Sequence, residues 1–216
     1  EAKSLHIDVL HSPGLSIKST IRPDLQRATE LALQEGLARY EAMTGRARFT
    51  GPEANLSEAV AKIGPVAAGG EPAWQQALES ARLPLYDVHW TPVVVLGGRK
   101  NGIQVGLADG RMLPLHGAGG VARRLQTYDV VYARVSEHGK VARADLRIRP
   151  TVQGAAIVLD NNTGAILAMS GGFSYPLSQL NRATQSQRQP GSTLKPFSYL
   201  AALKKGVQPN TVVRDM

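Results

Sequence analysis

Cysteine is absent from this 216-residue chain, so neither a disulfide framework nor a thiolate metal site is possible. No run of about 20 apolar residues occurs, so the sequence predicts no membrane-spanning helix, and no signal peptide is recognisable. Aromatic residues are scarce at 5%, but the apolar fraction of 43% is that of an ordinary globular protein. The chain is therefore long and apolar enough for one or two domains with cores of their own.

Signatures of several kinds of site are also missing. There is no glycine-rich phosphate-binding loop, and no aromatic-basic motif that would indicate nucleic-acid binding. His89, His116 and His138 are widely spaced and lack a paired acidic cluster, so we predict no metal site and no cofactor. The chain does have a net charge of +8, which favours an anionic partner but suits a solvated basic surface equally well.

The first third of the sequence predicts a strand followed by helices. Residues 15–21 alternate apolar and polar side chains, as a half-buried strand does. Pro23 suits the first turn of a helix, which we expect to run to about Tyr40 on one apolar stripe. The stripe consists of Leu25, Ala28, Leu31, Ala32 and Leu37. Two short helices are expected after it, at residues 56–63 and 72–83.

Residues 86–146 contain five short segments rich in β-branched residues and separated by turn signals. The segments are 93–96, 103–107, 112–115, 130–135 and 141–146. Short, evenly spaced strands of this kind predict a small barrel. The oligonucleotide/oligosaccharide-binding (OB) type is one candidate for it.

Two features of this region have both a structural and a functional interpretation. Trp74 is either a core anchor, which we favour, or a platform on which a sugar stacks. Arg143, Arg147 and Arg149 alternate along the chain. They line either a solvated strand edge, which we favour, or an anion-binding face.

The last third predicts a hairpin that leads to a helix. Residues 154–159 and 165–169 are nearly continuous apolar strands, so we expect their sheet to be covered on both faces. From Leu194 onward, apolar residues recur at helical spacing, and Ser192 or Thr193 is placed to cap the first turn.

Ser192 and Lys195 stand three residues apart at the start of this helix, so both face one side, a turn apart. A serine hydroxyl needs a nearby base to act as a nucleophile. A lysine amine can be that base when burial or neighbouring positive charge favours its neutral form. The backbone N–H of Ser192 is placed to stabilise an oxyanion. We therefore predict Ser192 as nucleophile and Lys195 as general base.

The stretch RQPGSTLKPFSYLAALKKG and the upstream runs GAAIVLDNNTGAILAMSGG and LNRATQSQRQPGSTLKPF resemble the active-site serine region of class A (bifunctional) penicillin-binding proteins, the peptidoglycan synthases. GLSIKSTIRPDLQRATELAL is similar to the family's linker into the transpeptidase domain. Asn181 and Arg182 match a polar pair of the family, for which we favour bracing of the loop over substrate contact.

The resemblance implies an α+β fold in three parts. These are a linker strand and helix at 1–48, an inserted OB-like β-domain at 49–148, and the N-terminal part of the transpeptidase domain at 149–216. The last part is expected to be an antiparallel sheet with packed helices. The family's glycosyltransferase domain does not precede this segment, and its Ser-x-Asn and Lys-Thr/Ser-Gly motifs do not follow Lys195. We therefore expect a piece of a longer protein that is inactive alone.

The implied function is that of a serine D,D-transpeptidase, which forms an acyl-enzyme with D-Ala-D-Ala stem peptides and, by mimicry, with β-lactams. Glycan strands and cell-wall assembly proteins are further implied partners. The implied location is the periplasmic face of the bacterial inner membrane, with contact to the membrane only through an N-terminal anchor outside this chain.

Two alternatives stay open. In one, the segment is a docking module of a cell-wall synthase, which holds a glycan or a partner protein on its β-domain and has no activity of its own. In the other, it is part of a β-lactamase or carboxypeptidase with the same serine chemistry. The linker-like residues 17–33 argue against the second, because those smaller enzymes have no need for such a lead-in.

Overall fold

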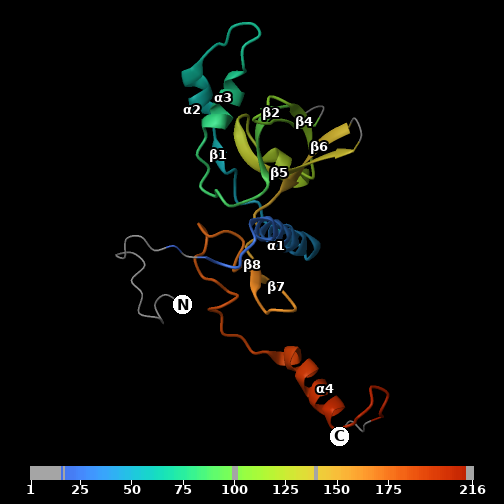
Figure 1. Cartoon of the computed structure of the whole chain (residues 1–216). Helices are drawn as coiled ribbons and strands as arrows, with labels where there is room; N and C mark the ends of the chain where they lie inside the picture. Colours follow the sequence, from blue (N-terminus) through green and yellow to red (C-terminus); the bar gives the residue numbers. More distant parts are fainter. Residues whose placement is uncertain (1–15, 17, 99–101, 139–140, 213–216) are drawn as a thin grey trace. The chain divides into compact units, whose positions relative to one another are not determined.

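The computed structural model describes residue 16 and residues 18–98, 102–138 and 141–212 (Figure 1). The chain divides into two compact units, Glu1–Thr184 and Gln185–Met216, and each is described by itself. The first unit contains a β-barrel, a long helix, two short helices and a hairpin, and the second contains a helical segment.

Five of the described strands close into a barrel. They are β2 (Thr91–Gly97), β3 (Gln104–Gly106), β4 (Met112–His116), β5 (Asp129–His138) and β6 (Val141–Arg147). Neighbours pair antiparallel except β4 and β6, which are parallel, and β6 also pairs with β5 and so closes the ring. The 3₁₀ helix η1 (Gly119–Arg123) lies between β4 and β5 in the chain, and β1 (Ala54–Asn55) pairs with β5. The predicted OB-like barrel and its five strands are confirmed.

Strand β2 has a core on both of its faces. Val93 and Val95 belong to the cluster inside the barrel, whereas Val94 belongs to a second cluster outside it, because successive side chains of a strand point to opposite faces. The outer cluster is completed by two helices near their predicted positions, α2 (Ser57–Ile63) and α3 (Ala73–Ser80).

Trp74 of α3 packs on this outer cluster and lies over Gly106 of β3, where the ring would collide with any Cβ. Its large apolar ring is thus used to cover the barrel wall. The interpretation of Trp74 as a core anchor is therefore confirmed.

Helix α1 (Pro23–Met43) begins at the predicted proline but buries only part of the predicted stripe. Ala28, Leu31 and Ala32 of the predicted stripe are exposed, so the prediction is wrong for these three, whereas Leu37 is partly buried and packs against the cluster that contains Trp90. The buried residues of α1 are Gln34 and Glu41, which are 2% and 1% exposed. The reason is that the segments packed on α1 present backbone N–H and C=O groups, which need polar partners when buried.

Strands β7 (Ala156–Leu159) and β8 (Ile166–Ser170) form the predicted antiparallel hairpin. Its turn is built as the sequence indicates: the Asp160 carboxylate accepts a hydrogen bond from the N–H of Asn162 at 2.8 Å. Gly164 adopts a φ of 72°, which glycine tolerates best.

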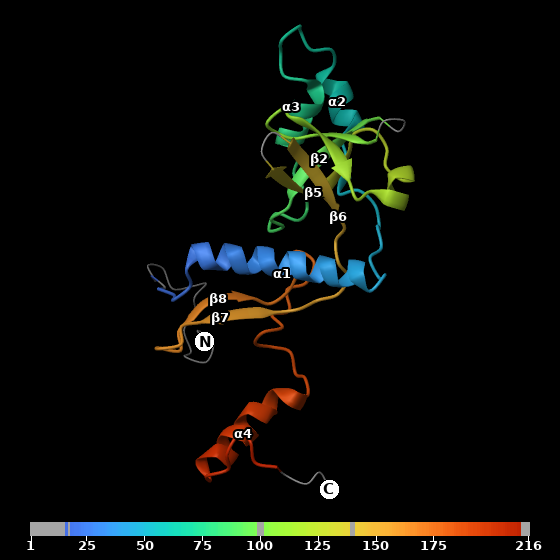
Figure 2. The ribbon, with the colours of Figure 1, turned by 90° about the vertical axis from the view of Figure 1, so that its right-hand side faces the viewer.

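The two faces of the hairpin differ. α1 runs along one face (Figure 2). On the other side, Ile157 and Leu159 are 44% and 54% exposed, so the expectation of cover on both faces is wrong within the first unit. The predicted strand at 15–21 lies partly outside the described residues, and its described part contains no strand. The chain nevertheless reaches β8, because the Arg22 N–H donates to the Leu167 carbonyl at 2.8 Å.

Candidate active site

Ser192 and Lys195 lie at the junction of two helical segments in the second unit. Ser192 is in the 3₁₀ helix η2 (Gly191–Leu194), and Lys195 is the first residue of α4 (Lys195–Lys204). The Lys195 N–H donates a hydrogen bond to the Ser192 carbonyl. Residues three apart eclipse in a 3₁₀ helix, so this turn places the two side chains on the same side.

The local sequence explains the junction. Gly191 adopts a φ of 52°, a conformation that favours glycine, and turns the chain into η2. Pro196 lies in the first turn of α4, where its missing N–H has no partner in the helix anyway.

No side chain caps η2 or α4, so the prediction that Ser192 or Thr193 acts as a cap is wrong. The chain enters α4 through a 3₁₀ turn, in which the carbonyls of Pro190 and Ser192 accept the N–H groups of Thr193 and Lys195. These backbone bonds satisfy donors that a cap would otherwise serve. The Ser192 hydroxyl is consequently not used by a cap.

The side chains of the second unit are largely exposed. Phe197, Leu200 and Leu203, which are part of the predicted apolar face of α4, are 67%, 50% and 48% exposed. Lys195 is exposed as well. The described part of this unit therefore does not by itself supply the desolvation that favours a neutral amine.

Asn181 and Arg182 lie in the first unit, in the loop after β8. The Arg182 N–H donates to the Gly171 carbonyl at 3.0 Å, and the Arg182 guanidinium donates to the Leu180 carbonyl at 3.2 Å and to the Ser178 hydroxyl at 3.1 Å. A Cβ on Gly171 would come within 2.7 Å of the Asn181 Cα, so this close approach requires glycine. Of the predicted site residues, Asn181 and Arg182 thus lie in the first unit, and Ser192 and Lys195 lie in the second.

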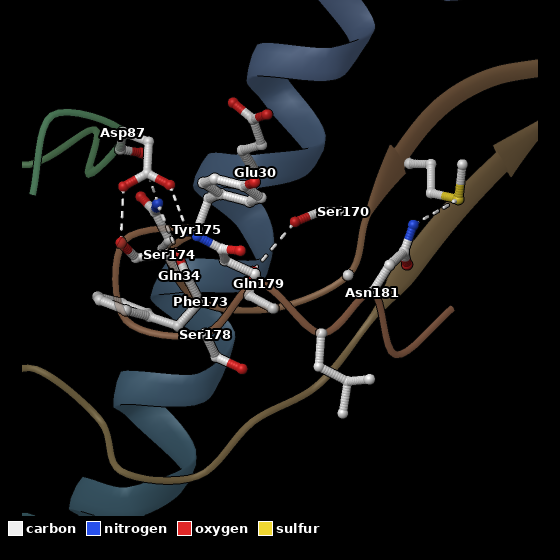
Figure 3. A pocket seen from close by; sticks show the side chains of 14 residues that line it. Glu30, Gln34, Asp87, Ser170, Phe173, Ser174, Tyr175, Ser178, Gln179 and Asn181 are labelled. Atoms are coloured by element: carbon white, nitrogen blue, oxygen red, sulfur yellow. Dashed lines mark hydrogen bonds between the residues drawn. The ribbon is translucent and has the colours of Figure 1, made fainter. Parts of the chain in front are cut away.

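Beside this loop lies a polar cavity of about 260 Å³, which sequence reasoning missed (Figure 3). Glu30 and Gln34 reach it from α1, and Asp87 reaches it from the segment that precedes β2. The rest of its lining comes from β8 and from the chain that follows β8, up to Asn181.

Three polar side chains of α1 fix the surroundings of this cavity. Gln26 pairs with Met169 as a neighbouring strand would, with its Nε2 donating to the carbonyl and its Oε1 accepting the N–H, both at 2.9 Å. The Glu30 carboxylate lies 2.7 Å from Nε2 of His89. Gln26, Glu30 and Gln34 are spaced by four residues and so share one helix face. That spacing was the available signal in the sequence.

The alternating arginines are engaged within the first unit. Arg147 forms two hydrogen bonds with Glu35 of α1, at 2.9 and 3.2 Å. The Arg149 guanidinium lies 3.2 Å from the carboxylate of Glu53, and Arg143 is paired at 3.0 Å with an aspartate of its own strand. Arg143 is exposed, as the solvated edge predicts, whereas Arg147 and Arg149 are partly buried in ion pairs, which corrects both interpretations for these two residues.

Two further kinds of feature are absent from the part of the chain that the structure describes. No helix there is both long and apolar enough to cross a membrane. No three His, Asp or Glu side chains there are grouped as they would be around a metal ion.

Comparison with known proteins shows what the sequence is similar to. Residues 154–216 match the family described as penicillin binding protein transpeptidase domain. Penicillin-binding protein 1A of Rickettsia conorii is 31% identical over 96% of this chain and 25% of that protein, and its counterpart from Neisseria flavescens is 40% identical over 57% of this chain and 16% of that protein. The crystal structure of penicillin-binding protein 1A from Haemophilus influenzae matches with a TM-score of 0.60 and 26% identity, over 92% of this chain and 28% of that chain.

The chain thus spans about a quarter of the length of the relatives it matches most fully. The matched structure agrees with an α+β fold made of an OB-like barrel and part of a transpeptidase domain. Residues 154–216 thus match the penicillin-binding protein transpeptidase family, and most of the chain is similar to a part of penicillin-binding protein 1A.

Proposed function

We propose that the full-length protein is a peptidoglycan D,D-transpeptidase with Ser192 as its acylating nucleophile. The observation that carries the proposal is the placement of Ser192 and Lys195 one turn apart, within the residues that match the transpeptidase family. The substrate is the D-Ala-D-Ala end of a stem peptide, and β-lactams acylate the same serine as mimics of that end.

In the proposed acylation, Ser192 Oγ attacks the carbonyl carbon of the penultimate D-alanine, while the hydroxyl proton passes to Lys195 Nζ. The new O–C bond replaces the C–N bond to the terminal D-alanine, whose amine takes up the proton and leaves. An amino group of a second stem peptide then attacks the acyl-enzyme, which forms the cross-link and restores the Ser192 hydroxyl. With a β-lactam, the first step opens the ring and the amine stays attached.

The Ser192 N–H is the proposed oxyanion donor. It has no acceptor among the described residues, and it lies at the start of η2, where N–H groups lack helical partners. Lys195 is the proposed general base. Because the described part of the second unit leaves this amine exposed, we infer that other parts of the full-length protein shield it.

The remaining assignments are part of the same proposal. Asn181 and Arg182 brace the loop after β8, a role supported by the hydrogen bonds of Arg182 to Gly171 and Ser178. The protein acts at the periplasmic face of the bacterial inner membrane, on stem peptides, glycan strands and β-lactams, together with cell-wall assembly proteins. The membrane anchor and a peptidoglycan glycosyltransferase domain lie in the part of the protein outside this chain.

The docking alternative has less support. Arg147 and Arg149 motivated an anionic ligand, but both are paired with carboxylates inside the first unit, so their charges are not available to one. Retention of the protein on purified sacculi at low salt and its release at high salt would favour the alternative.

Labelling of the full-length protein with a fluorescent penicillin tests the proposed function. We expect the parent protein to be labelled and Ser192→Ala not to be. Ser198→Ala, which changes another serine on α4, is the matched control and should be labelled like the parent. Equal labelling of Ser192→Ala and the parent would refute the assignment.

A further inference from the structure

The segment that precedes the first barrel strand, β2, is hydrogen-bonded to the segment that follows the hairpin strand β8. Asp87, between α3 and β2, accepts two hydrogen bonds with its carboxylate: one from the Ser174 hydroxyl and one from the Tyr175 N–H, both at 2.7 Å. Figure 3 shows these groups facing one another beside the cavity. Ser174 is only 3% exposed, so its hydroxyl depends on Asp87 for a partner.

Gln34 of α1 joins the same two segments from a third direction. Its Nε2 donates to the carbonyls of Asp87 and Phe173, at 2.9 and 3.1 Å, and its Oε1 accepts the His89 N–H at 3.0 Å. Gln34 is 2% exposed, and a buried amide left without these partners would be costly. All of these hydrogen bonds form together only when α1, the segment before β2 and the segment after β8 lie in one fixed arrangement.

Aromatic packing holds the junction on the barrel side. The ring centroid of Phe173, which is 1% exposed, lies 5.3 Å from that of Trp90, and that of Trp90 lies 6.2 Å from that of Tyr132. The Tyr132 hydroxyl donates to the Leu85 carbonyl at 3.0 Å. Residues from both sides of the junction thus share one small core.

From Ser174 the contacts continue along the loop toward Ser192. The Ser178 N–H donates to the Ser174 carbonyl at 3.2 Å, and the Ser178 hydroxyl accepts from the Arg182 guanidinium at 3.1 Å. An unbroken series of hydrogen bonds therefore links Asp87, at the entrance of the barrel, to Arg182, ten residues before Ser192.

We propose that Asp87 is a positioning residue for acylation, through which the barrel fixes the loop that leads to the nucleophile. This inference rests on the proposed function of Ser192. Asp87 is not one of the proposed reacting groups, so its proposed effect is on how well the serine is oriented, a factor to which reaction rates are sensitive. The acylation rate constant should therefore depend on Asp87, and the affinity of the initial penicillin complex should not.

The test uses the full-length protein, its Asp87→Ala, Asp87→Asn and Ser174→Ala variants, and Asp109→Ala as the control for loss of a carboxylate elsewhere on the barrel. Two quantities are measured: hydrogen exchange of the amides from Tyr175 to Arg182, and penicillin acylation separated into initial affinity and acylation rate constant. For Asp87→Ala we expect the Tyr175 amide to exchange about tenfold faster or more and the rate constant to fall about tenfold, with the affinity unchanged.

Asp87→Asn should restore both quantities to within about threefold of the parent, because its amide oxygen still accepts the Tyr175 N–H and its amide nitrogen can donate to the Ser174 hydroxyl. Asp109→Ala should behave like the parent. Ser174→Ala removes one of the two hydrogen bonds, so it should change both quantities in the same direction by less, and it keeps the test decisive if Asp87→Ala does not fold.

A parent-like acylation rate constant in Asp87→Ala would overturn the inference, even if the amides exchanged faster. If Asp87→Ala does not fold, the same result in Ser174→Ala would overturn it. Either result would leave the proposed function intact. A loss of affinity with an unchanged rate constant would overturn it as well. Failure of the proposed function has a different signature, in which Ser192→Ala is still labelled by penicillin.

Discussion

The Arg147 guanidinium of β6 forms a two-point ion pair with the Glu35 carboxylate of α1: Nε lies 2.9 Å from Oε1, and Nη2 lies 3.2 Å from Oε2. The side chains are 22% and 12% exposed, so the pair is largely shielded from solvent. Two parallel hydrogen bonds also fix the relative orientation of their partners. The pair therefore ties the long helix to the barrel at a defined angle.

We expect a coupling energy of about 1–3 kcal/mol between Glu35 and Arg147. A double-mutant cycle of Glu35→Ala and Arg147→Ala, read by urea unfolding, measures it. The exposed pair of Arg111 and Glu137 is the control, and its coupling should be smaller, because solvent screens exposed charges. Equal coupling in the two pairs would contradict the prediction.

Glu41 should make stability depend on pH. Burial raises the pKa of its carboxyl group, but hydrogen bonds from Thr151 and Val152 outweigh burial and hold the pKa below its usual value. Its contribution is therefore fully present above the unfolded-state pKa of about 4.3 and is lost as the pH falls through the lower folded-state value. Urea unfolding should show a stability difference between parent and Glu41→Gln that shrinks as the pH falls from 7 to 3.

Glu53 provides the control of opposite sign. Burial raises the pKa of its carboxyl group, and the Arg149 charge offsets this only in part. Folding therefore disfavours the charged form, and the contribution of Glu53 to stability declines as the pH rises from about 4.3 toward the raised folded-state pKa. The stability of the parent relative to Glu53→Gln should fall over that range. If both variants showed the same trend with pH, these assignments would be wrong.

Gly171→Ala should disturb the loop that leads to Ser192. The new Cβ would meet the Asn181 backbone, within 2.7 Å of its Cα, and overpacking of this kind costs about 1–3 kcal/mol. Gly36→Ala is the matched control, because nothing lies within 4 Å of its Cβ position on α1, and alanine in a helix should stabilise by about 0.5–1 kcal/mol. Thermal unfolding of both variants checks the opposite signs.

Lys195→Ala should lower penicillin acylation by about 10²–10⁴-fold, the usual contribution of a general base. Lys195→Arg should not restore it, because a guanidinium does not lose its proton at accessible pH. Lys204→Ala, at the end of the same helix, should acylate like the parent. Stopped-flow acylation of the full-length variants provides the measurement, and a fully active Lys195→Arg would exclude proton transfer to this side chain.

Local signals in the sequence were sufficient for most elements. The run of β-branched residues from Val93 to Val95 predicted β2, and the apolar runs 154–159 and 165–169 predicted the hairpin, because strand propensity depends on residues close in the chain. The spacing of Ser192 and Lys195 likewise predicted that their side chains lie on the same side of the helical turn. The prediction of a cap failed because a 3₁₀ turn and a capped helix start both satisfy the first N–H groups, and Pro190 and Gly191 favoured the turn.

The burial of α1 was not predictable in the same way. Its apolar positions Leu31 and Ala32 are exposed, whereas Gln34 and Glu41 are buried. Periodicity counts apolar side chains, but it does not show that a partner segment brings unpaired backbone groups to the helix. For the same reason the arginines could not be interpreted correctly, because Glu35 and Glu53 are distant in the sequence from Arg147 and Arg149.

The sequence by itself thus determined the strands of the barrel and of the hairpin and the Ser192–Lys195 turn, since each depends on contacts a few residues apart. Only the tertiary structure decided which polar residues are buried and that Asp87 meets Ser174, 87 residues further along. Such partners are chosen by the packing of whole elements, whose buried donors and acceptors must all be matched at once.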